Sequence, residues 1–168
     1  MNKQATWPFN CFFAATLLLC LLFLFKAITD ININELYGSF LSLLFYTIIL
    51  AAVQQLPVTL PFQAEVTVDF AIVFSAILIF GSSISIILVF IATFITEFSR
   101  HKVMPLYKSI FNINLYVIIV GVASFIYNKI GGIPGQINLN QDILRIIILI
   151  FAYLFVNVSL VTIALSLL

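Results

Sequence analysis

The stretch that decides the fold is residues 143–168, which read ILRIIILIFAYLFVNVSLVTIALSLL. These 26 residues include a single charged side chain, Arg145. A helix needs about 20 apolar residues to cross a bilayer, so this run is long enough to span one. A spanning helix normally leads into basic residues at its cytoplasmic end, and none follows here. We therefore expect a membrane protein whose natural chain continues past Leu168 into a cytoplasmic domain.

Composition extends the membrane prediction to the whole chain. Apolar residues make up 64% and charged residues 8%, and the mean hydropathy is +1.25, whereas soluble domains carry about 25% charged residues. The 18 Phe and 6 Tyr exceed what so short a soluble core can bury. The net charge of +1 excludes the basic face that nucleic-acid binding requires. Cys11 and Cys20 would lie about 13 Å apart along a helix, too far for a disulfide, so we interpret both as packing residues.

Six apolar segments predict an all-α fold, a single six-helix transmembrane bundle that forms one domain over residues 1–168. The small residues 81–83, Gly-Ser-Ser, predict a tight helical hairpin between the third and fourth segments. Pro57 and Pro61 predict an extended loop before the third. Asp142 is well suited to cap the start of the sixth helix. The predicted helices are 11–28, 37–53, 66–80, 84–99, 109–127 and 143–168.

Basic residues predict the orientation of this bundle. Arg100, Lys102 and Lys108 cluster in the loop between the fourth and fifth segments. Short loops rich in Lys and Arg stay in the cytoplasm. Placing this loop there also places Lys3 and both chain ends there. We predict a multi-pass protein of the cell (plasma) membrane, as in a bacterial inner membrane, with cytoplasmic N- and C-termini.

Ionisable residues inside the apolar segments are candidate sites, because charges are costly in a bilayer. Asp69 lies at the start of the third segment. Its simpler interpretation, which we favour, is a carboxylate in the first helical turn, stabilised by the positive end of the helix dipole. The alternative is an acid that faces a cavity and binds a cation or the amine of a ligand.

Glu97 lies one turn before the end of the fourth segment. Arg100 at i+3 and His101 at i+4 share its helix face, so we favour a local ion pair at the membrane interface. His101 is the sole histidine, and no cluster of Cys, Asp or Glu supplies the further ligands that zinc needs. We therefore expect no metal site.

Two pairs of polar residues share helix faces at i and i+4. Asn112 and Tyr116 lie on the fifth predicted helix, and Tyr153 and Asn157 lie on the sixth. Asn in membrane helices can form interhelical hydrogen bonds worth about 1 kcal/mol. The same four side chains can instead line a polar pocket between these helices, with Asp69 beside them. The sequence leaves both interpretations open.

Five motifs stand out between residue 66 and the end of the chain: the hairpin at Gly81, Arg100-His101-Lys102, LYKSIFN (106–112), YNKIGG (127–132) and YLFVN (153–157). In these motifs the chain from about residue 66 to 168 resembles the membrane-embedded N-terminal region that precedes bacterial HD-GYP and some GGDEF signalling domains. The stretch from the basic loop to Phe111-Asn112 is the most distinctive part. This resemblance implies a catalytic domain outside these 168 residues, so no cyclic-di-GMP chemistry falls on any residue here.

The chain has six apolar segments, and the pattern Val-Thr-Val-Asp (66–69) leads into the hairpin. In these two features it is also similar to the substrate-binding S components of energy-coupling-factor vitamin transporters. It implies a small standalone protein that binds a vitamin-like solute. The first segment departs from that family, because Ala14 and Ala15 are adjacent where an Ala-x-x-x-Ala spacing is typical.

We predict an integral membrane sensory or anchoring module that feeds a cytoplasmic signalling domain C-terminal to it. The alternative is a small-solute-binding S component of a transporter. Neither function is that of an enzyme, and neither calls for a cofactor. The expected partners are the lipid bilayer, a small-molecule ligand and either a second copy of the chain or the output domain, with no nucleic acid.

Overall fold

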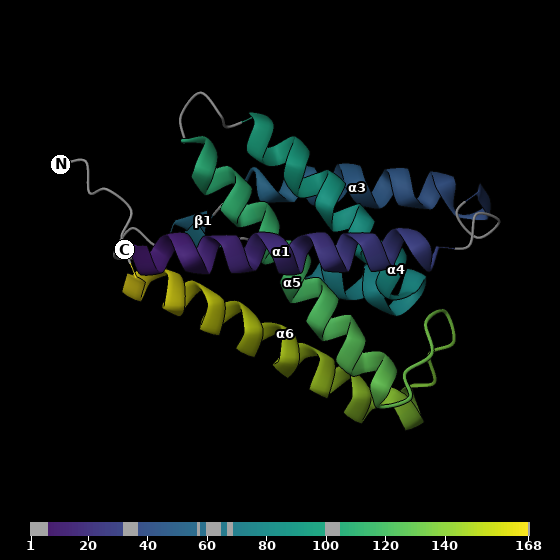
Figure 1. Cartoon of the computed structure of the whole chain (residues 1–168). Helices are drawn as coiled ribbons and strands as arrows, with labels where there is room; N and C mark the ends of the chain where they lie inside the picture. Colours follow the sequence, from purple (N-terminus) through teal and green to yellow (C-terminus); the bar gives the residue numbers. More distant parts are fainter. Residues whose placement is uncertain are drawn as a thin grey trace.

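The computed structural model describes residues 7–31, 37–56, 58–59, 65–66, 69–99 and 105–167. The fold is all-α, as predicted, apart from one antiparallel pair of two-residue strands (Figure 1). By length and composition, four of the described helices can cross a membrane: α1, α4, α5 and α6. The elements are α1 (Trp7–Thr29), α3 (Phe40–Gln54), β1 (Val58–Thr59), β2 (Glu65–Val66), α4 (Phe70–Ser99), α5 (Leu106–Lys129) and α6 (Leu139–Leu167).

The helix α4 folds back on itself at Gly81. This residue has φ 78° and ψ −174°, a left-handed conformation that glycine adopts without a Cβ clash. In a straight helix Asp69 and Thr93 would lie about 36 Å apart. Instead, the amide Nε2 of Gln54 hydrogen-bonds to both side chains, at 3.2 Å each. α4 therefore consists of two antiparallel arms, 70–80 and 82–99, and the predicted hairpin is present.

The structure does not support six membrane spans. The first arm of α4 has 11 residues and is about 16 Å long, roughly half the thickness of the hydrocarbon core. Helix α3 has 15 residues and is about 22 Å long. Hydropathy counts apolar residues but does not reveal that the chain turns back before it has crossed the bilayer. The second and third predicted spans, which correspond to α3 and the first arm of α4, are therefore too short to cross the bilayer.

Several predicted boundaries also differ from the structure. The third segment was expected from residue 66, but Glu65 and Val66 pair with Val58 and Thr59, so α4 starts at Phe70. Helix α6 starts at Leu139 rather than near residue 143. Asp142 is therefore not the cap but lies one turn inside the helix. Its Oδ2 accepts the backbone N–H of Asn138 at 2.8 Å, so it stabilises the start of the helix from within.

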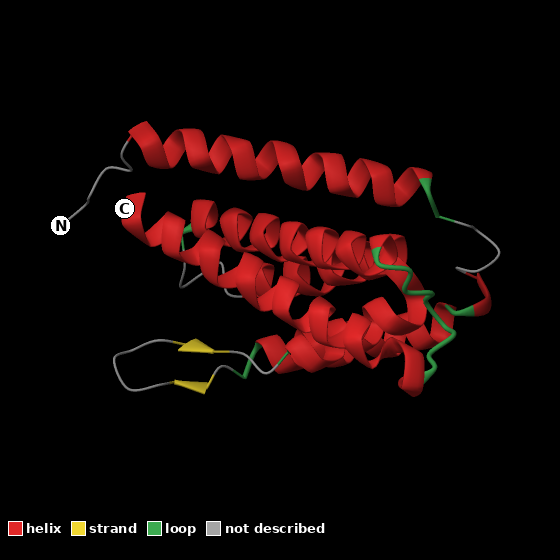
Figure 2. Ribbon diagram, turned by 90° about the horizontal axis from the view of Figure 1, so that it is seen from below, coloured by secondary structure: helices red, strands yellow, loops and turns green. Residues whose placement is uncertain are grey.

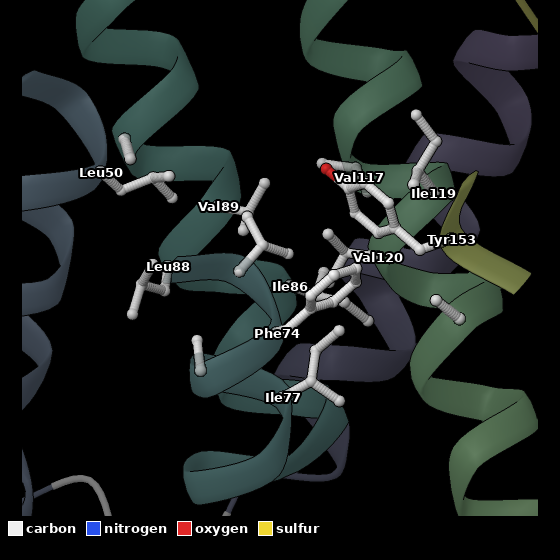
Figure 3. Close-up of a cluster of buried hydrophobic side chains, with 14 of the residues drawn as sticks. Leu50, Phe74, Ile77, Ile86, Leu88, Val89, Val117, Ile119, Val120 and Tyr153 are labelled. Carbon is white, nitrogen blue, oxygen red and sulfur yellow. The ribbon is translucent and has the colours of Figure 1, made fainter. Parts of the chain in front are cut away.

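The centre of the bundle is formed by α4 and α5, and α1, α3 and α6 pack around them. Ile77 and Val89 of α4 meet Val117 and Val120 of α5 in a core that excludes solvent (Figure 3). Most large side chains on α1 and α6 are exposed instead, and in a bilayer these apolar faces would meet lipid. Helices α1 and α6 thus pack against the central pair with one face and expose the other.

The two ends of the bundle differ in what they hold. Figures 1 and 2 place the start of α1 and the end of α6 at one end, which we call the terminal end. Gly81 and residues 130–138 lie at the opposite end, which we call the loop end. There the N–H of Gly135 donates to Leu78 O at 2.8 Å, which fixes the loop on the α4 turn. The start of α1 and the end of α6 therefore lie at the same end of the bundle, and the membrane topology of the two termini stays a prediction.

Candidate functional site

A polar cluster forms near the terminal end of the bundle, where α3 meets both arms of α4. Gln54 is the last residue of α3, and its buried amide bridges Asp69 and Thr93. Asp69 immediately precedes α4, and its backbone carbonyl accepts the N–H groups of Ile72 and Val73. The fold-back at Gly81 is what brings Asp69 to the level of Thr93. The turn therefore builds the site from residues distant in sequence.

Thr96 holds the second arm of α4 against α3. Its hydroxyl lies 3.0 Å from Ala92 O in its own helix and 3.3 Å from Ala51 O in α3. The side chain is buried. A hydroxyl that bonds a carbonyl on the next helix is a common means of joining membrane helices.

Glu97 is the second acid of the cluster, and 95% of its surface is covered, since its relative exposure is 5%. Its Oε1 accepts a hydrogen bond from Asn112 Nδ2 of α5 at 3.0 Å. Its Oε2 is buried and has no hydrogen-bond partner among the described residues. Burying half of a carboxylate without a partner is costly, so this oxygen calls for a ligand or another donor.

A cavity of about 490 Å³ lies beside these groups, between α3, α4, α5 and α6. This volume falls in the usual range for small-molecule sites. Asp69 and Glu97 place two carboxylates in its wall, and no basic side chain is found among its described lining residues. One side is aromatic: the Tyr153 ring packs edge-on against Phe74, with centroids 4.9 Å apart (Figure 3). The cavity is therefore acidic, with an aromatic wall.

All five residues that the sequence singled out as ligand-binding line this one cavity. Asn112 and Tyr116 reach it from α5, Tyr153 and Asn157 reach it from α6, and Asp69 reaches it from the start of α4. The i, i+4 spacing of each pair was the signal that placed them on one face. The pocket interpretation thus has a geometric basis, and ligand binding itself stays a prediction.

The predicted interfacial ion pair has a different outcome. Glu97 lies in the cavity wall and bonds Asn112, while Arg100 and His101 lie outside the described residues. The pairing of Glu97 with them is therefore still a prediction. The ion pair within the described ranges joins Asp142 to Arg145 at the loop end. No group of three or more His, Cys, Asp or Glu that could hold a metal occurs in those same ranges.

Sequence reasoning missed Gln54, Thr93 and Thr96. Gln54 was assigned to the loop with Pro57 and Pro61, whereas it ends α3 and points into the bundle. Thr93 and Glu97 share a helix face at i and i+4, a spacing that would have revealed a polar stripe on α4. The fold-back at residues 81–83 was predicted, but no local pattern indicates that it places Asp69 beside this stripe.

Comparisons of the chain with protein-family models, curated proteins and solved structures found no match. The resemblances to the membrane regions of HD-GYP and GGDEF proteins and to S components therefore stay predictions, and the function rests on the site alone.

Proposed function

We propose that this chain is a membrane-embedded sensory module that binds a small organic cation in the cavity between α3 and α6. The observation that carries the proposal is Glu97, a buried acid in the cavity wall with one oxygen held by Asn112 and the other without a hydrogen-bond partner among the described residues. Asp69 adds a second carboxylate to the same wall. A cationic ligand would supply the charge and the hydrogen bond that Glu97 Oε2 lacks.

An organic cation fits this site better than a metal ion does. A metal ion would need several oxygen ligands converging at about 2.0 to 2.6 Å, and the space here is far larger than such a shell. The rings of Tyr116 and Tyr153 line the same space. Aromatic faces attract ammonium groups by cation–π interaction, which favours an amine or quaternary ammonium.

The part played by α6 favours a sensor over a plain anchor. This helix contributes Tyr153 and Asn157 to the cavity, and it lies at the edge of the bundle with most of its surface exposed. A ligand that binds better to one position of α6 than to another would shift the helix. Such shifts of about 1–2 Å are a common signalling device. A carrier subunit for a small solute would use the same cavity without needing this displacement.

Co-purification tests the binding. The protein is extracted from the membrane with its lipids in polymer nanodiscs, and bound small molecules are identified by mass spectrometry. We expect a positively charged organic molecule with the wild type and its loss from Glu97→Gln, which keeps the size of the side chain and removes its charge. Asp30→Ala is the matched control, because Asp30 is an exposed acid that does not line this cavity. A wild type that carries no organic cation defeats the proposal and leaves membrane anchoring.

A distance measurement tests the sensor. Spin labels are attached to cysteines at Leu18 and Leu165, two exposed positions on α1 and α6, in a Cys11→Ser, Cys20→Ala background. We expect the distance distribution to shift when the co-purifying molecule is added back to stripped protein. An unchanged distribution with retained binding favours the carrier subunit over the sensor.

A further inference from the structure

The buried and the exposed residues that line the cavity differ in polarity, and Asn112, Tyr116 and Asn157 lie between them as half-buried residues. The buried group is rich in polar side chains: Gln54, Asp69, Thr93, Thr96 and Glu97. The exposed group is mostly apolar: Phe70 of α4 with Leu154, Val158 and Val161 of α6, joined by Thr162. The cavity thus has a polar floor and an apolar rim.

The rim marks where the cavity reaches the surface. Phe70 is 42% exposed and Val158 is 63% exposed, although both also line the internal space. The opening therefore lies between the first arm of α4 and α6. Towards the loop end, the ring of Phe74 on α4 packs against the ring of Tyr153 on α6. This contact closes the opening on that side.

This opening faces the bilayer in a membrane-embedded bundle. It lies on the flank of α6, a helix long and apolar enough to cross the membrane, along residues 154–162 near the terminal end. Exposed apolar side chains on such a flank contact lipid tails. A water-soluble solute gains nothing from a rim of Phe, Leu and Val, whereas an alkyl chain packs against it without loss of hydrophobic contact.

We infer that the ligand is an amphipathic cation that enters sideways from the bilayer. Its ammonium head meets Glu97 and Asp69 on the floor, and its alkyl tail lies between Phe70 and Val158 and extends into the lipid. This inference rests on the proposed cation-binding function, and it adds the chemical class and the route of entry. Polar floor, apolar rim and lateral position all follow from the same lining residues.

Photolabelling in nanodiscs tests the inference. The probe is a dodecyltrimethylammonium analogue that carries a photoreactive diazirine in its tail, and labelled peptides are mapped by mass spectrometry. We expect labelling around Phe70, Leu154 and Val158. Unlabelled dodecyltrimethylammonium should suppress it at concentrations at least tenfold lower than tetramethylammonium, which has the head alone. Neutral dodecanol, which has the tail alone, should not suppress it.

Two matched variants separate the entrance from the floor. Val158→Trp fills the rim at an exposed position, and we expect at least a tenfold loss of specific labelling. Leu165→Trp places the same ring on an exposed part of α6 that does not line the cavity, and labelling should be unchanged. Glu97→Gln should abolish the labelling that dodecyltrimethylammonium suppresses.

The results distinguish a failure of the lateral route from a failure of the proposed cation binding. If tetramethylammonium competes as well as the long-chain cation and Val158→Trp has no effect, the ligand is water-soluble and the lateral route is overturned, while cation binding stands. If neither cation suppresses labelling at the rim, both the inference and the proposed function are overturned.

Discussion

Each end of the bundle buries an acidic side chain, but the two acids differ in how many of their oxygens accept hydrogen bonds. Asp142 at the loop end and Glu97 at the terminal end have relative exposures of 4% and 5%. Both oxygens of Asp142 are used: Oδ2 accepts the N–H of Asn138, and Oδ1 pairs with Arg145. Glu97 uses one oxygen, and its second has no hydrogen-bond partner among the described residues. Asp142 is therefore fully paired within the fold, whereas Glu97 keeps an unused acceptor for the ligand that we propose.

Packing shows the same contrast. At the loop end, Tyr127 is fully buried against Gly132, and Pro134 lies 3.1 Å from where a Cβ on Gly81 would stand. The terminal end leaves about 490 Å³ between four helices, whereas a pocket of the same volume at the loop end is lined by the loop 133–138 and the start of α6. Because natural interiors are close-packed, the space between the helices agrees with the binding function that we propose. Substitutions at the two ends should therefore affect different properties.

The largest effect on stability is expected from Gly132→Ala. A Cβ at this position would overlap the Tyr127 ring, which is fully buried. We expect a loss of about 3 kcal/mol, at the upper end of typical overpacking costs. Thermal unfolding in detergent, followed by circular dichroism, measures it. Gly38→Ala is the control, because a Cβ there meets nothing within 4 Å. Equal unfolding temperatures for the two variants would show that the loop end is not tightly packed.

Asp142→Ala should cost somewhat less, about 2 kcal/mol. It leaves the N–H of Asn138 without its acceptor and Arg145 without its partner. Arg145 keeps 35% of its side chain exposed, so water compensates for part of its loss. The same unfolding measurement applies, with the exposed Asp30→Ala as control. If Asp142→Ala were as stable as Asp30→Ala, the loop-end acid would have no structural role.

These residues show how far the sequence could predict the structure. Apolar runs and residues 81–83 predicted the helical class and the hairpin, because both depend on local patterns of about one helix length. The span count failed, because Glu65 and Val66 pair with Val58 and Thr59, so that the arm before Gly81 starts at Phe70 and is about 16 Å long. Asp142 was expected to cap a helix, and its actual acceptor role depends on Asn138, four residues earlier.

The sequence predicted some residues of the candidate site and missed others. Polar residues inside apolar runs are rare enough to stand out, so Asn112, Tyr116, Tyr153 and Asn157 were identified by spacing alone. The cluster of Gln54, Asp69 and Thr93 could not be, because it exists only once α4 folds back and α3 ends beside it. Local periodicity predicts which face a residue takes, and only tertiary structure decides which faces meet.

Glu97→Gln is expected to leave the stability unchanged or to raise it slightly, whereas Gly132→Ala and Asp142→Ala should lower it. The amide keeps the shape and can still accept the hydrogen bond from Asn112, while it removes a buried charge. We expect unchanged stability or a gain of up to about 1 kcal/mol in ligand-free protein. A loss as large as that of Asp142→Ala would contradict this expectation. It would assign Glu97 to the ion pair with Arg100 or His101 that the sequence suggested.

The smallest effect is expected from Thr96→Val, which tests whether the polar residues at the terminal end act mainly as glue between helices. The substitution keeps the shape of the side chain and removes the hydroxyl that bonds Ala92 O and Ala51 O. Because interhelical hydrogen bonds in membranes average about 0.6 kcal/mol, we expect a loss of that size. Thr162→Val is the control, since Thr162 is exposed on α6. A loss above about 2 kcal/mol for Thr96→Val would mean that the cluster holds α3 to α4, and the distinction between a structural loop end and a binding terminal end would then fail.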